Sequence, residues 1–221
     1  MVNILIFGGG NHCLEIINYL KDVSKFSKKK FNIIGIIDPQ KIDSKNIEES
    51  AKKIKHYFNL KSVDFDKKKT FAIIAIGDPG QREKCRIEIK KNRIKLFTLI
   101  HPTSHVATSS KIGQGCILAP FSLIAPKVNL EENVLINNYA SINHHSFVGK
   151  SSVISPYATL SGQAHSGKMS FLGTNSVVMP NAKLGNYSKL SAGSILYNKT
   201  RDKCLVTGNP AIGIILKFKS K

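Results

Sequence analysis

The chain has 221 residues, 42% hydrophobic and 21% charged, a balance typical of a folded protein rather than a disordered one. Its formal net charge of +19 is shared by both halves, with 21 Lys and Arg against 11 Asp and Glu in residues 1–100, and 12 against 3 in residues 101–221. Because the excess is not gathered in one stripe and no helix-turn-helix, RNP or zinc-finger signature occurs, we expect no nucleic-acid partner. A positive field of this kind favours small anionic ligands.

The sequence also argues against a membrane or secreted protein. No apolar run approaches the roughly 18 residues that span a bilayer, and the first residues lack the basic segment of a signal peptide. The cysteines show no CxxC spacing, which favours reduced thiols in the cytoplasm over disulfides or a zinc site. They are Cys13, Cys85, Cys116 and Cys204.

The first hundred residues alternate between strand and helix patterns. Apolar β-type runs cover residues 4–7, 31–37, 71–76 and 96–100. Helical patterns cover residues 14–20 and 81–92. Strands separated by helices indicate right-handed crossovers, so residues 1–100 are predicted to form an α/β domain with a small, Rossmann-like parallel sheet.

From Val106 an aliphatic residue falls at every sixth position, and only Ser166 breaks this series of sixteen. A small or β-branched residue stands four places after each. The aliphatic positions are Val106, Ile112, Leu118, Ile124, Leu130, Ile136, Ile142, Val148, Ile154, Leu160, Leu172, Val178, Leu184, Leu190 and Leu196. A period of six fits neither a helix nor simple strand alternation, and is typical of a triangular parallel β-helix with about 18 residues per coil.

Residues 101–221 are therefore predicted to form a left-handed parallel β-helix of about five coils, with the aliphatic residues inside the prism. The flat outer faces of so short a solenoid favour a homo-oligomer. The tail is expected to leave the repeat after Thr200 and to pack back over the last coils.

A glycine turn follows the first predicted strand. Gly8, Gly9 and Gly10 allow backbone N–H groups to approach a pyrophosphate, and the helix that begins near Leu14 directs its positive end to the same place. The dinucleotide pattern GxGxxG fails, because its last glycine is replaced by Cys13. Asp38 closes the second strand and can accept hydrogen bonds from a ribose or a base. The alternative is a tight turn without a ligand.

Two adjacent histidines stand out in the β-helix. His144 and His145 occupy the third and fourth places of a hexapeptide whose interior position is Ile142, so both are expected to point outward. A neutral imidazole is the natural general base near pH 7, and the alternative is a pair of incidental surface histidines. His12 borders the glycine turn. The other histidines, His56, His101, His105 and His165, are expected in loops or at the surface.

Several motifs together resemble one family. They are Ile4-Leu-Ile-Phe-Gly-Gly-Gly-Asn-His12, Ile74-Ala-Ile-Gly77, Ile100-His-Pro-Thr103, Ile142-Asn-His-His-Ser-Phe-Val-Gly149 and Thr207-Gly-Asn-Pro-Ala211. The chain resembles, over essentially its whole length, the bacterial hexapeptide-repeat sugar acetyltransferases. This family includes sialic acid O-acetyltransferases and the N-acetyltransferases that act on UDP-4-amino-4,6-dideoxy sugars and GDP-perosamine.

The resemblance implies an acetyl-CoA-dependent N-acetyltransferase that acts on a nucleotide-linked amino sugar and works as a homotrimer in the cytoplasm. His144 matches the catalytic base, with His145 beside it, and Asn137 matches a residue near the acceptor sugar. The nucleotide is expected at Gly8, Gly9, Gly10, His12, Asp38 and Gly77. Acetyl-CoA is expected between subunits, beside Gly162, Thr174, Ala192 and Pro210.

The chain departs from the family pattern at two positions. Many relatives follow the catalytic histidine with an acidic residue that orients it, and here His145 stands in that place. Many also carry a second histidine further along the next hexapeptide, where this chain has Val153. The resemblance therefore says less about how the base is oriented and the thioester polarised than about the fold, although a backbone N–H can also serve as oxyanion donor.

Three other functions compete with N-acetylation. O-acetylation of a sialic acid or related sugar would use the same machinery. A zinc-dependent hydratase on the same fold needs an HxxxxH spacing, but Gly149 and Lys150 stand where the second histidine would be required, so no metal is expected. A non-catalytic sugar-nucleotide binder would not release a thiol from acetyl-CoA.

Overall fold

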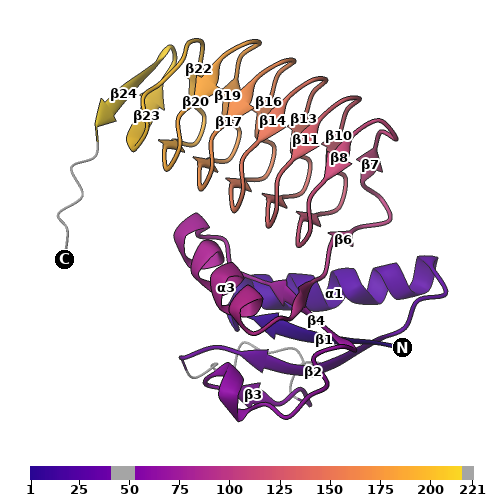
Figure 1. Ribbon diagram of the computed structural model, residues 1–221. Coiled ribbons are helices and arrows are strands. Elements are labelled where there is room, and N and C mark those ends of the chain that lie inside the picture. The colour runs from indigo at the N-terminus through magenta and orange to yellow at the C-terminus, as the bar shows by residue number, and fades with distance from the viewer. Residues whose placement is uncertain (41–52, 216–221) are drawn as a thin grey trace. The chain divides into compact units, whose positions relative to one another are not determined.

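The computed structural model describes residues 1–40 and 53–215 (Figure 1). The chain divides into two compact units, Met1–Pro102 and Thr103–Lys221. The first unit is an α/β fold with a small parallel sheet. The second is a left-handed parallel β-helix, as the six-residue period predicts.

The first unit contains a five-stranded sheet of order β3-β2-β1-β4-β5 in which every pair is parallel. Its elements are β1 (Val2–Phe7), α1 (Asn11–Phe26), β2 (Phe31–Ile37), β3 (His56–Tyr57), the 3₁₀ helix Leu60–Ser62, β4 (Thr70–Ile74), α3 (Pro79–Lys91) and β5 (Lys95–Leu96). The chain steps one way from β1 to β2 and the other way from β4 to β5. This reversal places a switch point where β1 meets β4, and ligands bind at such points in open α/β sheets.

The single strand predicted over residues 96–100 is wrong. The structure has two short strands there, β5 and β6 (Leu99–Ile100). Between them Phe97 packs edge-on against Phe31 and Phe71, with ring centroids 5.4 and 5.9 Å apart. The apolar run is continuous in the sequence, but Phe97, which lies between the two strands, packs in an aromatic cluster.

In the central strands β1 and β4 most residues are buried, on both faces of the sheet, as expected for a parallel sheet. On one face Leu5, Phe7 and Ile74 share a core with Ile89 of α3. The alternate residues of β1, Ile4 and Ile6, are fully buried as well. Side chains alternate along a strand, so the continuous apolar run is needed to cover both faces.

Arg82 of α3 is a charged residue that is nevertheless fully buried in this unit. Its Nη1 donates to the carbonyl oxygens of Ile74 and Ile76, at 2.8 and 2.9 Å. Ile74 is the last residue of β4, and Ile76 lies two residues beyond it. Arg82 thereby holds the loop that leads to Gly77.

The second unit is built from short strands that recur with the hexapeptide period and stack in three parallel sheets (Figure 1). The six-stranded sheet is formed by β7 (His105–Val106), β10 (Leu123–Ile124), β13 (Ser141–Ile142), β16 (Thr159–Leu160), β19 (Val177–Val178) and β22 (Ile195–Leu196). The five-stranded sheet is formed by β8 (Lys111–Ile112), β11 (Asn129–Leu130), β14 (Phe147–Val148), β17 (His165–Ser166) and β20 (Lys183–Leu184). The third sheet includes β9 (Ile117–Leu118), β12 (Leu135–Ile136), β15 (Val153–Ile154), β18 (Phe171–Leu172) and β21 (Lys189–Leu190).

Each strand pairs with the corresponding strand of the next coil, for example Ile124 with Ile142. The second residue of each strand points into the prism, where these side chains form one buried core. At most corners the chain turns through a residue with positive φ, such as Lys127 (60°), His145 (60°), Gln163 (61°) and Asn181 (62°). Corner residues of successive coils therefore stack in columns, one residue from each coil.

Ser166 takes the interior place that lacks an aliphatic side chain, and it is fully buried. Its hydroxyl lies 2.5 Å from that of Ser170, which donates to the hydroxyl of Ser152 at 3.0 Å. Ser152 in turn donates to the carbonyl of Gly167 at 2.8 Å. The chain of hydroxyls satisfies the polar group that interrupts the aliphatic series.

We expect Ser170→Ala to destabilise the protein by about 1–3 kcal/mol, because it leaves the Ser166 hydroxyl buried without an acceptor. The midpoint of urea unfolding, measured at fixed protein concentration, should fall. The double variant Ser166→Ala/Ser170→Ala removes both hydroxyls and should recover part of the loss. A wild-type midpoint for Ser170→Ala would contradict the role of this network.

The tail leaves the six-residue repeat after Thr200, as predicted, but it stays on the solenoid. β23 (Cys204–Gly208) pairs in parallel with β21, with Val206 opposite Leu190, and so adds one more rung. The regular repeat would place Gly208 opposite Leu190, so the pairing differs from the repeat by two residues. The six-residue period therefore does not predict this rung. β24 (Ala211–Ile215) then returns antiparallel to β23.

Candidate active site

The glycine turn of the first unit lies at the carboxyl edge of the sheet, where β1 meets β4. Gly8 has φ +102°, and a Cβ there would lie 2.6 Å from Ile76 Cγ1 and 2.8 Å from the Ala75 carbonyl oxygen. Its N–H donates to the Ile37 carbonyl at 2.9 Å. Glycine at position 8 is thus required by the close approach of two strand ends, whether or not a ligand binds.

Asp38 is tied to this turn. Its Oδ2 accepts from the Gly9 N–H at 2.7 Å and its Oδ1 accepts from the Gln40 N–H at 2.8 Å. The carboxylate therefore shapes the turn, and it faces the same edge as the start of α1, whose N-cap is Gly10. Gly77 lies exposed after β4, with nothing within 4 Å of the place where a Cβ would stand. The structure brings the predicted nucleotide residues of this unit to one edge of the sheet.

His12 stands in the first turn of α1 and is held by a residue that sequence analysis missed. Its Nδ1 lies 2.8 Å from Glu15 Oε2, and this hydrogen bond to His12 is the main reason that the pKa of Glu15 is lowered. His12 Nε2 is buried and has no hydrogen-bond partner among the described residues. Histidine followed by glutamate one helical turn later was a signal for this pair, because such residues are neighbours on a helix.

The neighbouring Cys13 is a structural thiol. It is buried on α1, and burial, reinforced by the charge of Asp38, raises its pKa to about 12. A thiol in such surroundings is not a nucleophile near neutral pH. Cys13 thus fills the space at the place where the dinucleotide pattern would have glycine.

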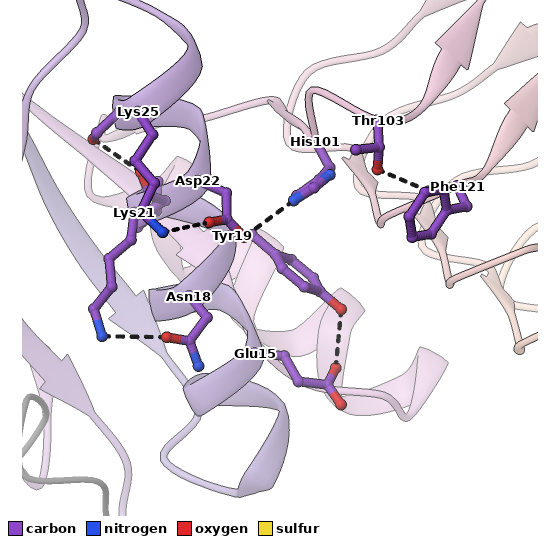
Figure 2. Close-up of polar contacts among 11 residues, drawn as sticks. Glu15, Asn18, Tyr19, Lys21, Asp22, Lys25, His101, Thr103 and Phe121 are labelled. Carbon is purple, nitrogen blue, oxygen red and sulfur yellow. Dashed lines mark hydrogen bonds and ion pairs between the residues drawn. The ribbon is translucent and has the colours of Figure 1, made fainter.

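His101 was expected in a loop or at the surface, and it lies in the loop between β6 and β7 (His105–Val106) but not at the surface. Its side chain is buried, with 5% of the residue exposed. Its ring packs edge-on against Tyr19, with centroids 5.5 Å apart, and its Nε2 lies 3.4 Å from Asp22 Oδ2 (Figure 2). Tyr19 donates in turn to Glu15 at 3.5 Å, so α1 carries a row of polar contacts along one side.

In the second unit, His144 and His145 lie in the turn between β13 and β14, and both are exposed. Their Nδ1 atoms are 3.2 Å apart, and their rings are nearly perpendicular at 84°. Backbone hydrogen bonds fix the turn on both sides: the His145 N–H donates to Pro126 at 3.1 Å, and the His144 carbonyl accepts from Gln163 at 2.9 Å. The two imidazoles are therefore held on a rigid corner.

Gly162 is the residue one coil after His144, at the equivalent position of the turn. A Cβ at position 162 would lie 2.5 Å from His144 Cε1 and 2.6 Å from its Nε2. The imidazole therefore rests on the bare backbone of Gly162. Among the described residues the Gly162 N–H has no hydrogen-bond acceptor, so it is available to a ligand beside the ring.

The other predicted residues of this unit lie at a different corner. Asn137 precedes β13 and donates through Nδ2 to the Ile154 carbonyl at 3.2 Å. Thr174 and Ala192 precede β19 and β22 and are both exposed. Within one chain the structure thus separates Asn137, Thr174 and Ala192 from His144 and Gly162, although both corners border the six-stranded sheet. Pro210 lies in the turn between β23 and β24.

The corner that holds Asn137 also carries an aromatic stack that sequence analysis missed. Phe121, Tyr139 and Tyr157 take equivalent places on successive coils, and their rings are stacked with centroids 5.0 and 4.9 Å apart. Each remains about half exposed, at 53%, 48% and 54%. Their spacing equals one coil, so the sequence could have predicted the stack once the coil length was known. Thr103, at the start of the unit, accepts from the Phe121 N–H at 3.2 Å (Figure 2).

Two absences hold for residues 1–40 and 53–215. No group of three or more His, Cys, Asp or Glu side chains is placed to hold a metal ion. In the same residues, neither α1 nor any other helix has the length and apolarity to cross a bilayer. Val153, which stands where many relatives carry a histidine, is buried on β15.

Comparison with known proteins gives one match for the N-terminal part of the chain and several for the fold of nearly the whole chain. Residues 3–89 match the family model of the PglD N-terminal domain. The acetyltransferase domain of PglB from Neisseria gonorrhoeae shares the fold with a TM-score of 0.84 and 22% identity, over 97% of this chain and 100% of that one. PerB from Caulobacter crescentus, solved with CoA and GDP-perosamine, gives 0.80 and 22%, over 97% and 98%.

Curated relatives match a shorter segment. The acyl-[acyl-carrier-protein]–UDP-N-acetylglucosamine O-acyltransferase of Chlamydia caviae is 33% identical over 66 residues, 30% of this chain and 24% of that protein. The corresponding protein of Rickettsia bellii is 34% identical over 61 residues, 28% and 22% of the two chains. The chain thus spans about a quarter of the length of these relatives. Together the comparisons show similarity to the PglD N-terminal domain in residues 3–89 and, over nearly the whole chain, the fold of the PglB acetyltransferase domain and PerB.

Proposed function

We propose that this protein is an acetyl-CoA-dependent acetyltransferase that acts on the amino group of a nucleotide-linked amino sugar. The observation that carries the proposal is the exposed imidazole of His144, held over the bare backbone of Gly162 on a β-helix. The shared fold with PerB, a protein solved with CoA and GDP-perosamine, supports the substrate class.

Acetyl transfer requires three things of the protein: a general base, a hydrogen-bond donor to the oxyanion, and correct orientation of the two substrates. Acetyl-CoA supplies the activated acetyl group. The sugar amine attacks the thioester carbon, the C–N bond forms, the C–S bond breaks, and CoA leaves as the thiolate. His144 Nε2 accepts the proton that the amine gives up. The Gly162 N–H, which has no acceptor within the described residues, donates to the oxygen on which negative charge develops.

The first unit is proposed to bind the nucleotide. Gly10, the N-cap of α1, presents its backbone N–H at the start of the helix, a natural place for phosphate oxygens, whereas the Gly9 N–H is already bonded to Asp38. His12 offers a buried Nε2 without a partner among the described residues, and Gly77 leaves open space beside the turn. Asp38 positions Gly9 through its 2.7 Å hydrogen bond.

The active assembly is proposed to be a homotrimer with acetyl-CoA between subunits. The residues assigned to the acetyl-CoA and acceptor sites lie at two corners of the coil, with His144 and Gly162 at one and Asn137, Thr174 and Ala192 at the other. A site that joins corners of two neighbouring copies would use all of them. The half-exposed stack of Phe121, Tyr139 and Tyr157 supports an interface at this corner.

One observation favours O-acylation as the second candidate function. The curated relatives that match part of the chain are O-acyltransferases that act on a UDP-linked sugar. An amine and a hydroxyl make similar demands on the base, so the site geometry serves either acceptor.

The test is release of free CoA thiol from acetyl-CoA with a panel of acceptors: UDP-, dTDP- and GDP-linked 3-amino and 4-amino sugars, their hydroxyl counterparts, and free sialic acid. We expect release with at least one amino sugar nucleotide, and a product whose mass has increased by one acetyl group. Release with hydroxyl acceptors alone would establish the second candidate. If none of the acceptors, amino or hydroxyl, supports release of CoA thiol, both candidate functions are rejected.

A further inference from the structure

The contact between His144 and His145 has a chemical consequence. A hydrogen bond between two Nδ1 atoms at 3.2 Å requires that one ring donate and the other accept. For His144 Nε2 to be the base, its proton must sit on Nδ1 and point to an acceptor. The geometry meets this requirement when His145 is neutral and carries its own proton on Nε2.

The backbone of His145 explains why this ring can reach its neighbour. Its φ of 60° lies in the left-handed region, which non-glycine residues rarely adopt, and Lys127, Gln163 and Asn181 of the same column share this conformation. The turn is pinned to Pro126 on the coil before it and, through the His144 carbonyl, to Gln163 on the coil after it. The pair is thus held by the coil geometry and not by a flexible loop.

No carboxylate of the neighbouring turns takes this role. The turns on either side of the pair are Ala125-Pro-Lys-Val128 and Ser161-Gly-Gln-Ala164, and their one charged residue is Lys127. On the flanking strand β17, His165 packs against Phe147 at 5.6 Å, and its pKa is lowered by burial and by Lys183 and Lys199. None of these described turns and flanking strands contains Asp or Glu, so His145 is the acceptor within reach of His144 Nδ1.

We propose that His145 is the positioning residue of the site: its neutral imidazole accepts the Nδ1 proton of His144 and orients Nε2 toward the acceptor, as a carboxylate would in its place. The inference rests on the proposed function for its kinetic consequences but not for the pairing itself. A protonated His145 has no acceptor atom left, so protonation of either ring disables the base.

Three substitutions that suit the left-handed backbone separate this role from a structural one. His145→Gly removes the acceptor without backbone strain. His145→Asn keeps a neutral acceptor, and His145→Asp supplies a carboxylate; both residues tolerate this φ. Asn181→Gly is the matched control, because Asn181 has φ 62° in the same column two coils further on.

With an amino sugar acceptor, we expect His145→Gly to lower kcat about tenfold or more, because orientation of the base is lost, while KM for acetyl-CoA changes less than about twofold. His145→Asn should recover most of kcat. His145→Asp should recover kcat and move the acid limb of its pH profile about one unit higher, since a carboxylate favours the charged form of His144. Asn181→Gly should match the wild type. An unchanged kcat in His145→Gly, or no recovery in His145→Asn, would overturn the proposal.

A second measurement needs neither substrate. In protein labelled with [¹³Cε1]-histidine and free of ligands, the NMR titration of His144 should shift when His145 is replaced by Asn or Asp. An unshifted titration in both variants would overturn the pairing, whatever the enzyme does. A shifted titration without thiol release from any acceptor in the panel would support the pairing and reject acyl transfer.

Discussion

Replacing His144 by alanine is expected to lower kcat for acetyl transfer at least about a hundredfold, the contribution typical of a general base. The side chain lies exposed on a rigid corner, so its loss should leave the fold intact. KM for acetyl-CoA should change little, because a loss confined to kcat marks an interaction made only in the transition state. Thiol release at saturating acceptor, together with the far-UV circular dichroism of the variant, measures both effects.

The control for this variant is His105→Ala. His105 is also an exposed histidine and lies on β7 of the six-stranded sheet, on a different coil. Its replacement should leave turnover within about twofold of the wild type, as expected for a surface substitution away from the site. Near-normal turnover in His144→Ala would remove His144 from the role of base.

Gly162→Ala is expected to lower kcat about tenfold to a hundredfold without unfolding the protein. The added Cβ would lie 2.5 Å from Cε1 and 2.6 Å from Nε2 of His144, so the imidazole must move away, and a displacement of about 1 Å can cost a hundredfold in rate. The backbone itself tolerates a side chain there, because the equivalent places on other coils hold Pro126, Pro180 and Asn198.

Pro180→Ala is the matched control, since it changes the same turn position one coil further on and removes atoms instead of adding them. It should leave kcat at the wild-type level. If Gly162→Ala raised KM for acetyl-CoA and left kcat unchanged, the glycine would be needed for contact with acetyl-CoA. It would then not be needed to leave space for the His144 ring. An NMR titration of His144 in Gly162→Ala would report the displacement directly.

In the first unit, the sequence pattern predicted the long strands but not the short elements. β2 was predicted at its observed bounds, because its apolar run ends sharply at Asp38. β3 and the 3₁₀ helix Leu60–Ser62 carried no usable pattern, since segments this short cannot display a period. His101 was expected in a loop or at the surface and does lie in a loop, but its burial was not predicted, because it depends on Tyr19 and Asp22 of the first helix, far away in the chain.

For the candidate site, too, the sequence predicted one feature and left another undetermined. The outward direction of His144 followed from Ile142 alone, since the six-residue period decides which side chains enter the prism. The departure at position 145 was visible in the sequence, but its meaning was not, because the 3.2 Å contact depends on two rotamers at one corner.

By itself the amino-acid order determined the β-helix, because a period of six sustained over so long a segment has one compact solution that buries every aliphatic side chain. Tertiary structure alone decided what happens across coils: the clearance that Gly162 provides for His144, the hydroxyl chain around Ser166, and the extra rung formed by β23. These depend on distances between residues on neighbouring coils, which are set by the spacing of stacked strands and not by local propensity.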